Sequence, residues 1–299
     1  MLKNKVLFKV VDIFYLALII VPFILGMALN VVTKPLADGI EITGARIFWQ
    51  IDFPVQPLVI TESQVNSWLV VIAITGLCLF LTHGIKAAGK ITVRQHIAEF
   101  IVEKAKNLVV TNMGEYFEGF APFIAAVLGL SAFSSLSSLT GMFPPTSDIN
   151  VVSGWAIVVF ILITYYKLKC GPVHYVKTLC SPVLLTPLNV ISEVATPVSM
   201  AFRHYGNVLS GFVISILVST GLSGLSKMLL GWLPGILGEI PFLQIGLPAI
   251  LSVYFDLFSG CLQAFIFAML TMLYVSGGFP AEEYFKRKNK KKQKSIGGN

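Results

Sequence analysis

Hydrophobic residues are arranged along this 299-residue chain in long runs that short polar segments separate. Most runs are about as long as a membrane-spanning helix, which needs roughly 20 apolar residues. They lack the strict alternation of apolar and polar positions that barrel strands require, so they predict helices. The pattern predicts an all-α integral membrane protein with about six membrane helices. The predicted spans are Val10–Val32, Ser67–His83, Phe120–Met142, Val151–Tyr166, a helix from about Asn189 to Leu225, and Pro241–Ser276.

The last two of these segments are too long for a simple crossing. A helix over residues 189–225 would be roughly 55 Å long at 1.5 Å per residue, and the second segment is about as long. The hydrocarbon core of a bilayer is only about 30 Å thick. We therefore expect two long, tilted or kinked, antiparallel helices that form a hairpin largely within the membrane. Turn-forming residues within 226–240, such as Pro234 and Gly235, connect its arms.

One polar segment, residues 92–112, differs in kind from the others. Its apolar side chains recur at helical spacing, opposite glutamates and lysines. This predicts an amphipathic helix that lies at the inner membrane interface. The apolar positions are Ile97, Phe100, Ile101, Ala105, Leu108 and Val109.

The first apolar run follows three lysines and allows two interpretations. It resembles a cleaved signal peptide, because Gly26-Met27-Ala28 has the small-residue spacing of a cleavage site. Its length, about that of a membrane span, favours a retained helix. We expect three regions: an extra membrane helix and external loop over residues 1–66, the core over residues 67–276, and a cytoplasmic polybasic tail over residues 277–299.

Composition and charge narrow the class of protein. The chain is 55% hydrophobic and 12% charged, with a mean hydropathy of +0.80, which excludes a soluble globule. Its net charge of +7 comes from seven basic residues between Lys286 and Lys294. No aromatic residues interleave with these charges, which favours a lipid-headgroup anchor over nucleic-acid binding. Lysines also follow the second and fourth predicted spans, so the positive-inside rule places both termini in the cytoplasm.

Polar residues inside the predicted hairpin are the candidates for chemistry. Arg203 is the only permanently positive residue between Leu179 and Ser226, and an arginine at membrane depth costs roughly 3 kcal/mol on insertion scales. The second arm carries Asp256 and Gln263, seven residues apart and hence on one face of an α-helix. Two interpretations stay open from periodicity alone: an ion path, or a buried Arg203–Asp256 pair that holds the hairpin together. The small and polar residues around the arginine on the first arm are Ser199, Gly206, Asn207, Ser210 and Gly211.

The order of several motifs resembles the a subunit of F-type ATP synthases, over about residues 60–276. The resemblance implies the membrane stator that lies beside a rotating ring of c subunits, with two aqueous half-channels. It implies partners as well: the c-ring, the peripheral-stalk b subunits, the rest of the F1FO complex, the bilayer and transported H⁺ or Na⁺. It also implies a bacterial cell membrane, the inner membrane. The motifs are Thr186-Pro187-Leu188-Asn189, Pro197-Val198-Ser199, Arg203-x-x-Gly206-Asn207, Leu262-Gln263-Ala264-Phe265, Ala121-Pro122-Phe123 and Pro144-Pro145-Thr146-Ser147-Asp148.

The same resemblance implies roles for single residues. Arg203 would face the ionisable carboxylate of each passing c subunit. Asn207 and Gln263 match the asparagine and glutamine of the family, and Asp256 falls where relatives carry a glutamate or histidine, which makes it the candidate ion relay. Some relatives carry a glutamate where this chain has Phe212. Because Phe212 cannot take part in the ion relay, the resemblance implies that Asp256 performs a larger part of it.

Three further polar residues of the first arm have less certain roles. Ser199 and Glu193 are candidates for lining a half-channel, although Glu193 is equally compatible with pairing to a nearby lysine. His204, directly after the arginine, favours a packing role over a relay.

Other functions are less consistent with the sequence. An ion-coupled secondary transporter is the alternative, but no internal inverted repeat is present. No HExxH, GxSxG or GxxxxGK[ST] motif occurs, so we expect a non-catalytic subunit with no nucleotide site, no cofactor and no metal. Whether the ion is a proton or sodium stays open, because its main ligands would lie on the c subunit.

Overall fold

The computed structural model describes residues 2–33, 44–54, 57–85, 91–169, 171–231, 243, 246, 250–251, 253–281 and 284. Three predictions lie outside these residues: the cytoplasmic position of Lys86 and Lys90, most of the connection within the hairpin, and the polybasic tail. The described residues contain six helical segments that are long and apolar enough to cross a membrane, which confirms the predicted fold class. These segments are Val6–Thr33, Glu62–Thr82, Glu115–Thr140, Ile149–Leu168, Val183–Leu229 and Val253–Gly278.

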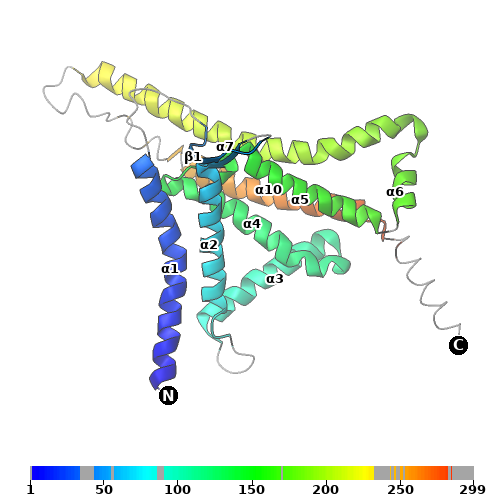
Figure 1. Ribbon diagram of the computed structural model, residues 1–299, viewed down its shortest axis with the longest axis horizontal. Helices are drawn as coiled ribbons and strands as arrows, with labels where there is room; N and C mark the ends of the chain where they lie inside the picture. Colours follow the sequence, from blue (N-terminus) through cyan, green and yellow to red (C-terminus); the bar gives the residue numbers. More distant parts are fainter. Residues whose placement is uncertain are drawn as a thin grey trace.

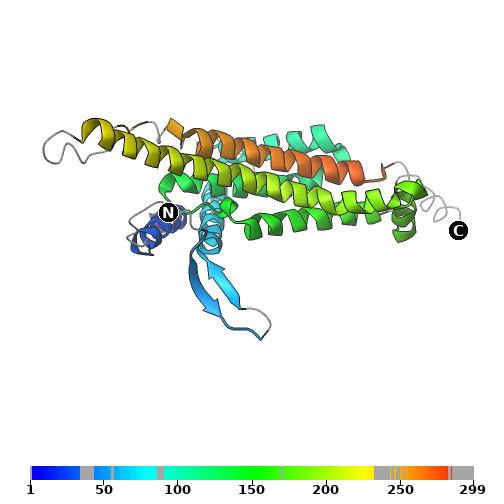
Figure 2. The same cartoon turned by 90° about the horizontal axis from the view of Figure 1, so that it is seen from above.

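The N-terminal part consists of two steep helices and a small hairpin (Figure 1). Helix α1 (Leu2–Thr33) packs along α2 (Glu62–Thr82), and Gly76 permits this close approach, because a Cβ there would lie 2.8 Å from Leu18 Cβ. Strands β1 (Ile47–Ile51) and β2 (Leu58–Thr61) form an antiparallel pair where the sequence predicted only a loop. The pair projects away from the helices in Figure 2.

Polar contacts fix α1 at both ends. Near one end, the carboxylate of Asp12 accepts a hydrogen bond from Arg94, at 2.8 Å, and lies 3.1 Å from the ring of His83. At the other end, Arg46 donates to Asn30 at 2.7 Å and forms an ion pair with Glu62 at 3.0 Å. A charged group at membrane depth needs such partners, so these contacts explain how the apolar helix tolerates an aspartate.

The middle of the chain forms the body of the molecule. Helix α3 (Val93–Met113) is the predicted amphipathic helix; Thr92 caps it by accepting a hydrogen bond from the Gln95 backbone. A short 3₁₀ turn, η1 (Glu115–Phe120), leads into α4 (Ala121–Leu136), and α5 (Ile149–Leu168) begins at the N-cap Asp148. The remaining short elements are the 3₁₀ turns η2 (Ser137–Thr140), η3 (Pro145–Ser147) and η4 (Val183–Leu185), and the helix α6 (Pro172–Leu179).

The last two helices form the predicted tilted pair. Helix α7 (Thr186–Leu230) has 45 residues, which corresponds to about 68 Å. It runs beside α10 (Gly260–Gly278) and across the direction of α1 and α2 in both views (Figures 1 and 2). The second arm begins with a π-helical stretch, η6 (Val253–Ser259), which the sequence did not indicate. Wider turns of this kind occur mostly as single insertions at functional sites.

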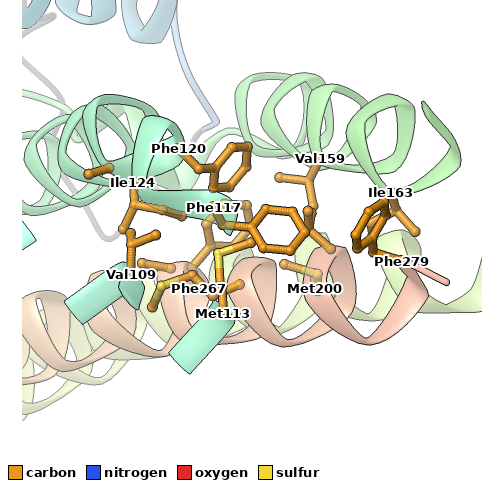
Figure 3. Close-up of a cluster of buried hydrophobic side chains, with 14 residues drawn as sticks. Val109, Met113, Phe117, Phe120, Ile124, Val159, Ile163, Met200, Phe267 and Phe279 are labelled. Carbon is orange, nitrogen blue, oxygen red and sulfur yellow. The ribbon is translucent and has the colours of Figure 1, made fainter. Parts of the chain in front are cut away.

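The core joins α3, η1, α4, α5, α7 and α10. Figure 3 shows Phe117 between the α5 side chain Val159 and the pair Met200 and Phe267 from α7 and α10, with Phe120 above Phe117. These side chains are at most 8% exposed. Since burial between helices fixes their relative rotation, this cluster determines which face of α7 is left uncovered.

Candidate functional site

Helix α7 presents two different faces. Ser199, Arg203, Gly206 and Ser210 follow one another at spacings of four, three and four residues, and all four are exposed. A Cβ at Gly206 would meet no atom within 4 Å. Only 6% of the most apolar stretch of this span is buried, against 44% for Val253–Gly278. The helix that carries the arginine is therefore the least covered of the six described spans.

The guanidinium of Arg203 forms no hydrogen bond or ion pair with any other described residue. The alternative of a buried Arg203–Asp256 pair is therefore not formed. An unpaired arginine at membrane depth is costly, and the described residues do not offset this cost with an ion pair or hydrogen bond.

An adjacent face of α7, about 100° around the helix, packs into the body. Met200, His204, Asn207 and Gly211 lie on it at helical spacing; Met200 is 2% exposed and His204 is fully buried. The sequence placed Asn207 and Gly211 in one stripe with the arginine. The structure divides that stripe, because the core cluster fixes the rotation of the helix.

His204 has the packing role that the sequence favoured. Its ring lies edge-on to Trp155 and Phe267, with centroid distances of 5.9 and 5.5 Å, and its Nε2 lies 3.3 Å from Ser131 Oγ. These contacts join α7 to α4, α5 and α10. The residue next to the arginine therefore anchors α7 to three other helices.

Asn207 joins the two arms of the hairpin. Its Nδ2 donates to Ser259 Oγ at 2.9 Å, and Ser259 Oγ also lies 3.2 Å from Asn207 Oδ1. One turn further, Gly211 packs against Phe255, where a Cβ would lie 3.1 Å from the ring. The arms therefore meet in a close, hydrogen-bonded contact one turn from Arg203.

This contact predicts a measurable coupling between the two residues. We expect Asn207→Leu and Ser259→Ala to destabilise the folded chain non-additively, with an interaction free energy of about 0.6 kcal/mol, the average for such pairs in membranes. Unfolding of the two single variants and the double variant in mixed detergent micelles would measure it. Additive effects would show that the hydrogen bond contributes nothing to stability.

The second arm holds Asp256 and Gln263 in different surroundings. Asp256 is half-buried within the π-helical stretch η6, whereas Gln263 is 5% exposed within α10. The sequence predicted that Asp256 and Gln263 share one face, on the assumption that the second arm is a continuous α-helix. The π-helical stretch η6 has wider turns, so a spacing of seven residues no longer implies one face. The structure therefore places the aspartate and the glutamine in different environments.

Buried hydroxyl groups surround the contact between the arms and α4. A Cβ at Gly260 would lie 2.5 Å from Ser135 Cβ, so α10 and α4 touch there. The hydroxyls of Ser135, Thr146 and Ser147 are buried and find no partner among the described residues. Buried polar groups nearly always bond to protein or water, so these hydroxyls are candidates for contact with water.

Glu193 lies at the other end of the polar face, ten residues before the arginine. Its carboxylate forms an ion pair with Lys167 Nζ of α5 at 2.5 Å, and the side chains are 17% and 25% exposed, respectively. Both residues line a cavity of about 390 Å³ between α5, α6, α7 and the end of α10. The pairing with a nearby lysine, one of the two alternatives that the sequence left open, is therefore present, and the lining of a half-channel stays a prediction. The sequence treated Lys167 only as a marker of the cytoplasmic side.

A second lysine, Lys169, fixes the end of α10. Its ammonium lies 4.9–5.9 Å from five ring centroids, and it donates to Tyr116 Oη at 2.7 Å. Burial is the largest single influence and lowers the pKa of Lys169, but the hydrogen bond to Tyr116 and the charge interactions with Tyr116, Tyr166 and Tyr165 together outweigh it, so this pKa is raised. This cage holds one wall of the cavity in place. The rings are those of Tyr116, Tyr165, Tyr166, Phe279 and Tyr284.

The fold and this polar region define a multi-pass helical membrane protein with an uncovered cation on its longest helix. The family described as ATP synthase A chain matches residues 64–276. The chain therefore belongs to the ATP synthase A chain family, and its function is that of the a subunit of the FO sector of an F-type ATP synthase. It is a bacterial membrane protein that works in a complex with other subunits of the synthase.

Three relatives illustrate the similarity. ATP synthase subunit a 3 of Pelobacter propionicus is 31% identical over 232 residues, which cover 74% of this chain and 90% of the relative. ATP synthase subunit a of Trichlorobacter lovleyi is 30% identical over 222 residues, with 72% and 86% covered. The subunit a of Bacillus pumilus is 31% identical over 200 residues, with 62% and 79% covered. Nothing in these comparisons favours a secondary transporter.

Proposed function

We propose that the exposed face of α7 borders a ring of c subunits and that Arg203 faces their ionisable carboxylates in turn. The observation that carries this proposal is the exposure of the Arg203 guanidinium without an ionic or hydrogen-bonding partner among the described residues. Small neighbours at Ser199, Gly206 and Ser210 support it, because they allow another helix to approach closely. The missing partner of the arginine is then an acid on the moving ring.

The physical consequence of this encounter is ion release. Desolvation raises the pKa of a carboxylic acid in lipid, and a nearby fixed cation lowers it. A c-subunit acid that reaches Arg203 therefore gives up its ion. The same fixed charge repels cations and so blocks direct leakage between the half-channels. One elementary charge that crosses 100 mV yields about 2.3 kcal/mol, so several steps around a ring contribute to each ATP.

Two polar regions are the proposed half-channels. On one side, Glu193 and Ser199 lead from the cavity toward Arg203. On the other side, Asp256 acts as the ion relay, and Asn207 and Gln263 are the further polar residues of that route. The buried hydroxyl of Ser135 beside Gly260 supports a hydrated route there.

The remaining assignments follow from the same function. We place the chain in the bacterial inner membrane with both termini in the cytoplasm, in contact with the peripheral-stalk b subunits through residues 1–66. The core is residues 67–276, and residues 277–299 anchor the chain to lipid headgroups. The transported ion is H⁺ or Na⁺. We expect the chain to carry no nucleotide site, cofactor or metal of its own, since its sequence contains no GxxxxGK[ST] motif, and ATP chemistry then belongs to partner subunits.

Disulfide cross-linking tests the position of the c-ring. In a background without native cysteines, we expect Ser199→Cys and Ser210→Cys each to cross-link to a cysteine placed beside the c-subunit carboxylate. Ile161→Cys is the matched control, because Ile161 lies on α5 and is 59% exposed. Immunoblotting of assembled complexes would measure the products. Equal cross-linking from position 161, or none from α7, would contradict the proposal.

A further inference from the structure

The Lys167–Glu193 ion pair lies where two cavities meet. The outer cavity, of about 390 Å³, is rimmed by α6 residues that include His174 and Tyr175. The inner cavity, of about 260 Å³, reaches Thr196 and Leu273. Lys167, Ser192, Glu193, Gly277 and Gly278 line both cavities. The ion pair therefore lies in the wall that the two cavities share.

Polar residues continue from this junction toward the arginine. Glu193, Thr196, Ser199 and Arg203 follow one another on α7 at spacings of three, three and four residues. At about 100° per residue, they lie within an arc of about 120°. The ion pair is therefore at the outer end of a polar face that leads to the cation of the proposed c-ring contact.

The geometry holds the lysine at the junction. A Cβ at Gly278 would lie 2.9 Å from Lys167 Cε, so the glycine leaves room for the lysine stem. The neighbouring Phe279 is fixed in the cage around Lys169. On the outer side, burial and then the Glu193 carboxylate raise the pKa of Tyr175, so its phenol stays protonated at the rim. The space left by Gly278 and the pairing with Glu193 therefore hold Lys167 at the junction of the two cavities.

We propose that the ammonium group of Lys167 acts as a fixed counter-ion of the Glu193 carboxylate. By staying paired with this carboxylate, Lys167 restricts ion passage between the two cavities. This inference rests on the proposed function. Its ammonium competes with the passing ion for the same carboxylate, and its charge repels incoming cations. Both effects act in the same direction: removal of the ammonium increases flux. Lys167 is thus a gating residue at the outer end of one half-channel.

Passive ion flux through FO tests this role. In vesicles that contain the complex stripped of its F1 part, we expect Lys167→Met to increase the flux driven by a K⁺ diffusion potential about fivefold, which corresponds to a partly exposed ion pair. Lys167→Arg should keep the flux at the wild-type level. Lys177→Met is the matched control, because Lys177 is an exposed lysine on the neighbouring α6 and lines neither cavity.

A chemical rescue separates gating from folding. In a cysteine-free background, the flux of Lys167→Cys should return to the low level after reaction with 2-aminoethyl methanethiosulfonate, which restores an ammonium group. The neutral reagent methyl methanethiosulfonate should leave the flux high. An unchanged or reduced flux in Lys167→Met, or equal effects of the two reagents, would overturn the gate.

The wild-type vesicles show separately whether the proposed function holds. Their flux should stop when a carbodiimide blocks the c-ring carboxylate. Flux that resists this block would overturn the c-ring proposal. A blocked wild type with an unresponsive Lys167→Met would overturn the gate alone.

Discussion

Replacing Arg203 with alanine is expected to abolish ion-driven ATP synthesis while the complex still assembles. The guanidinium is exposed and has no ionic or hydrogen-bonding partner among the described residues, so its loss removes no internal contact of that kind. It removes the cation that makes each c-ring acid release its ion. We expect the rate of synthesis to fall about 100-fold or more, as when a charge-stabilising group is lost from an active site. Inverted membrane vesicles energised by respiration would measure it.

The same variant should also leak. Without the fixed cation, ions can cross directly between the half-channels, so passive permeability after removal of F1 should rise. Lys227→Ala is the matched control, because it removes an exposed cation from the same helix near its end. Full coupling in Arg203→Ala, or an equal loss in Lys227→Ala, would refute the assigned role.

Replacing Asp256 with asparagine is expected to reduce ion flux strongly, by about tenfold or more, the lower range for loss of a proton-transferring group. The amide has nearly the shape of the carboxylate but cannot exchange a proton. Asp256→Glu should retain much of the flux, because it keeps the acid. Flux through F1-stripped vesicles would measure both variants. Asp52→Asn, on the exposed β-hairpin, is the control for loss of one negative charge. Unchanged flux in Asp256→Asn would remove this residue from the mechanism.

Phe212 offers a second test of the relay. Some relatives carry a glutamate at this position, whereas here the ring packs edge-on against Phe143 at 6.1 Å. If Asp256 performs the ion relay that this glutamate performs in such relatives, then adding Phe212→Glu to the Asp256→Asn variant should restore part of the flux. Complete absence of recovery in an assembled complex would argue that the two positions do not share one route.

The spans were predictable because the bilayer requires long apolar helices with satisfied backbones. The amphipathic segment predicted over residues 92–112 is helix α3, Val93–Met113, since its periodicity alone determines a helix with one apolar face. The predicted span over residues 151–166 is α5, Ile149–Leu168, and the small difference reflects the Asp148 cap. The strands β1 and β2 were missed, because a short hairpin outside the apolar runs leaves only a weak pattern.

The π-helical stretch was not predictable from periodicity. Its seven residues, Val253–Ser259, have the composition of an ordinary apolar helix. The wider turns of η6 place Asp256 half-buried, whereas Gln263 is buried in α10. The relation between these two residues therefore depends on backbone geometry that spacing along the sequence does not encode.

By itself, the sequence determined the class of protein, the long tilted pair of helices and the residues worth testing, because hydrophobic length and charges at membrane depth are properties of the chain. Only the tertiary structure decided which way those residues face. The packing of Met200, His204 and Phe267 fixes the rotation of α7, which leaves Arg203 outside the core and turns Asn207 toward Ser259. The partner of Glu193 likewise became evident only when α5 brought Lys167 beside it. Such choices depend on contacts between segments far apart in sequence, and no local pattern records them.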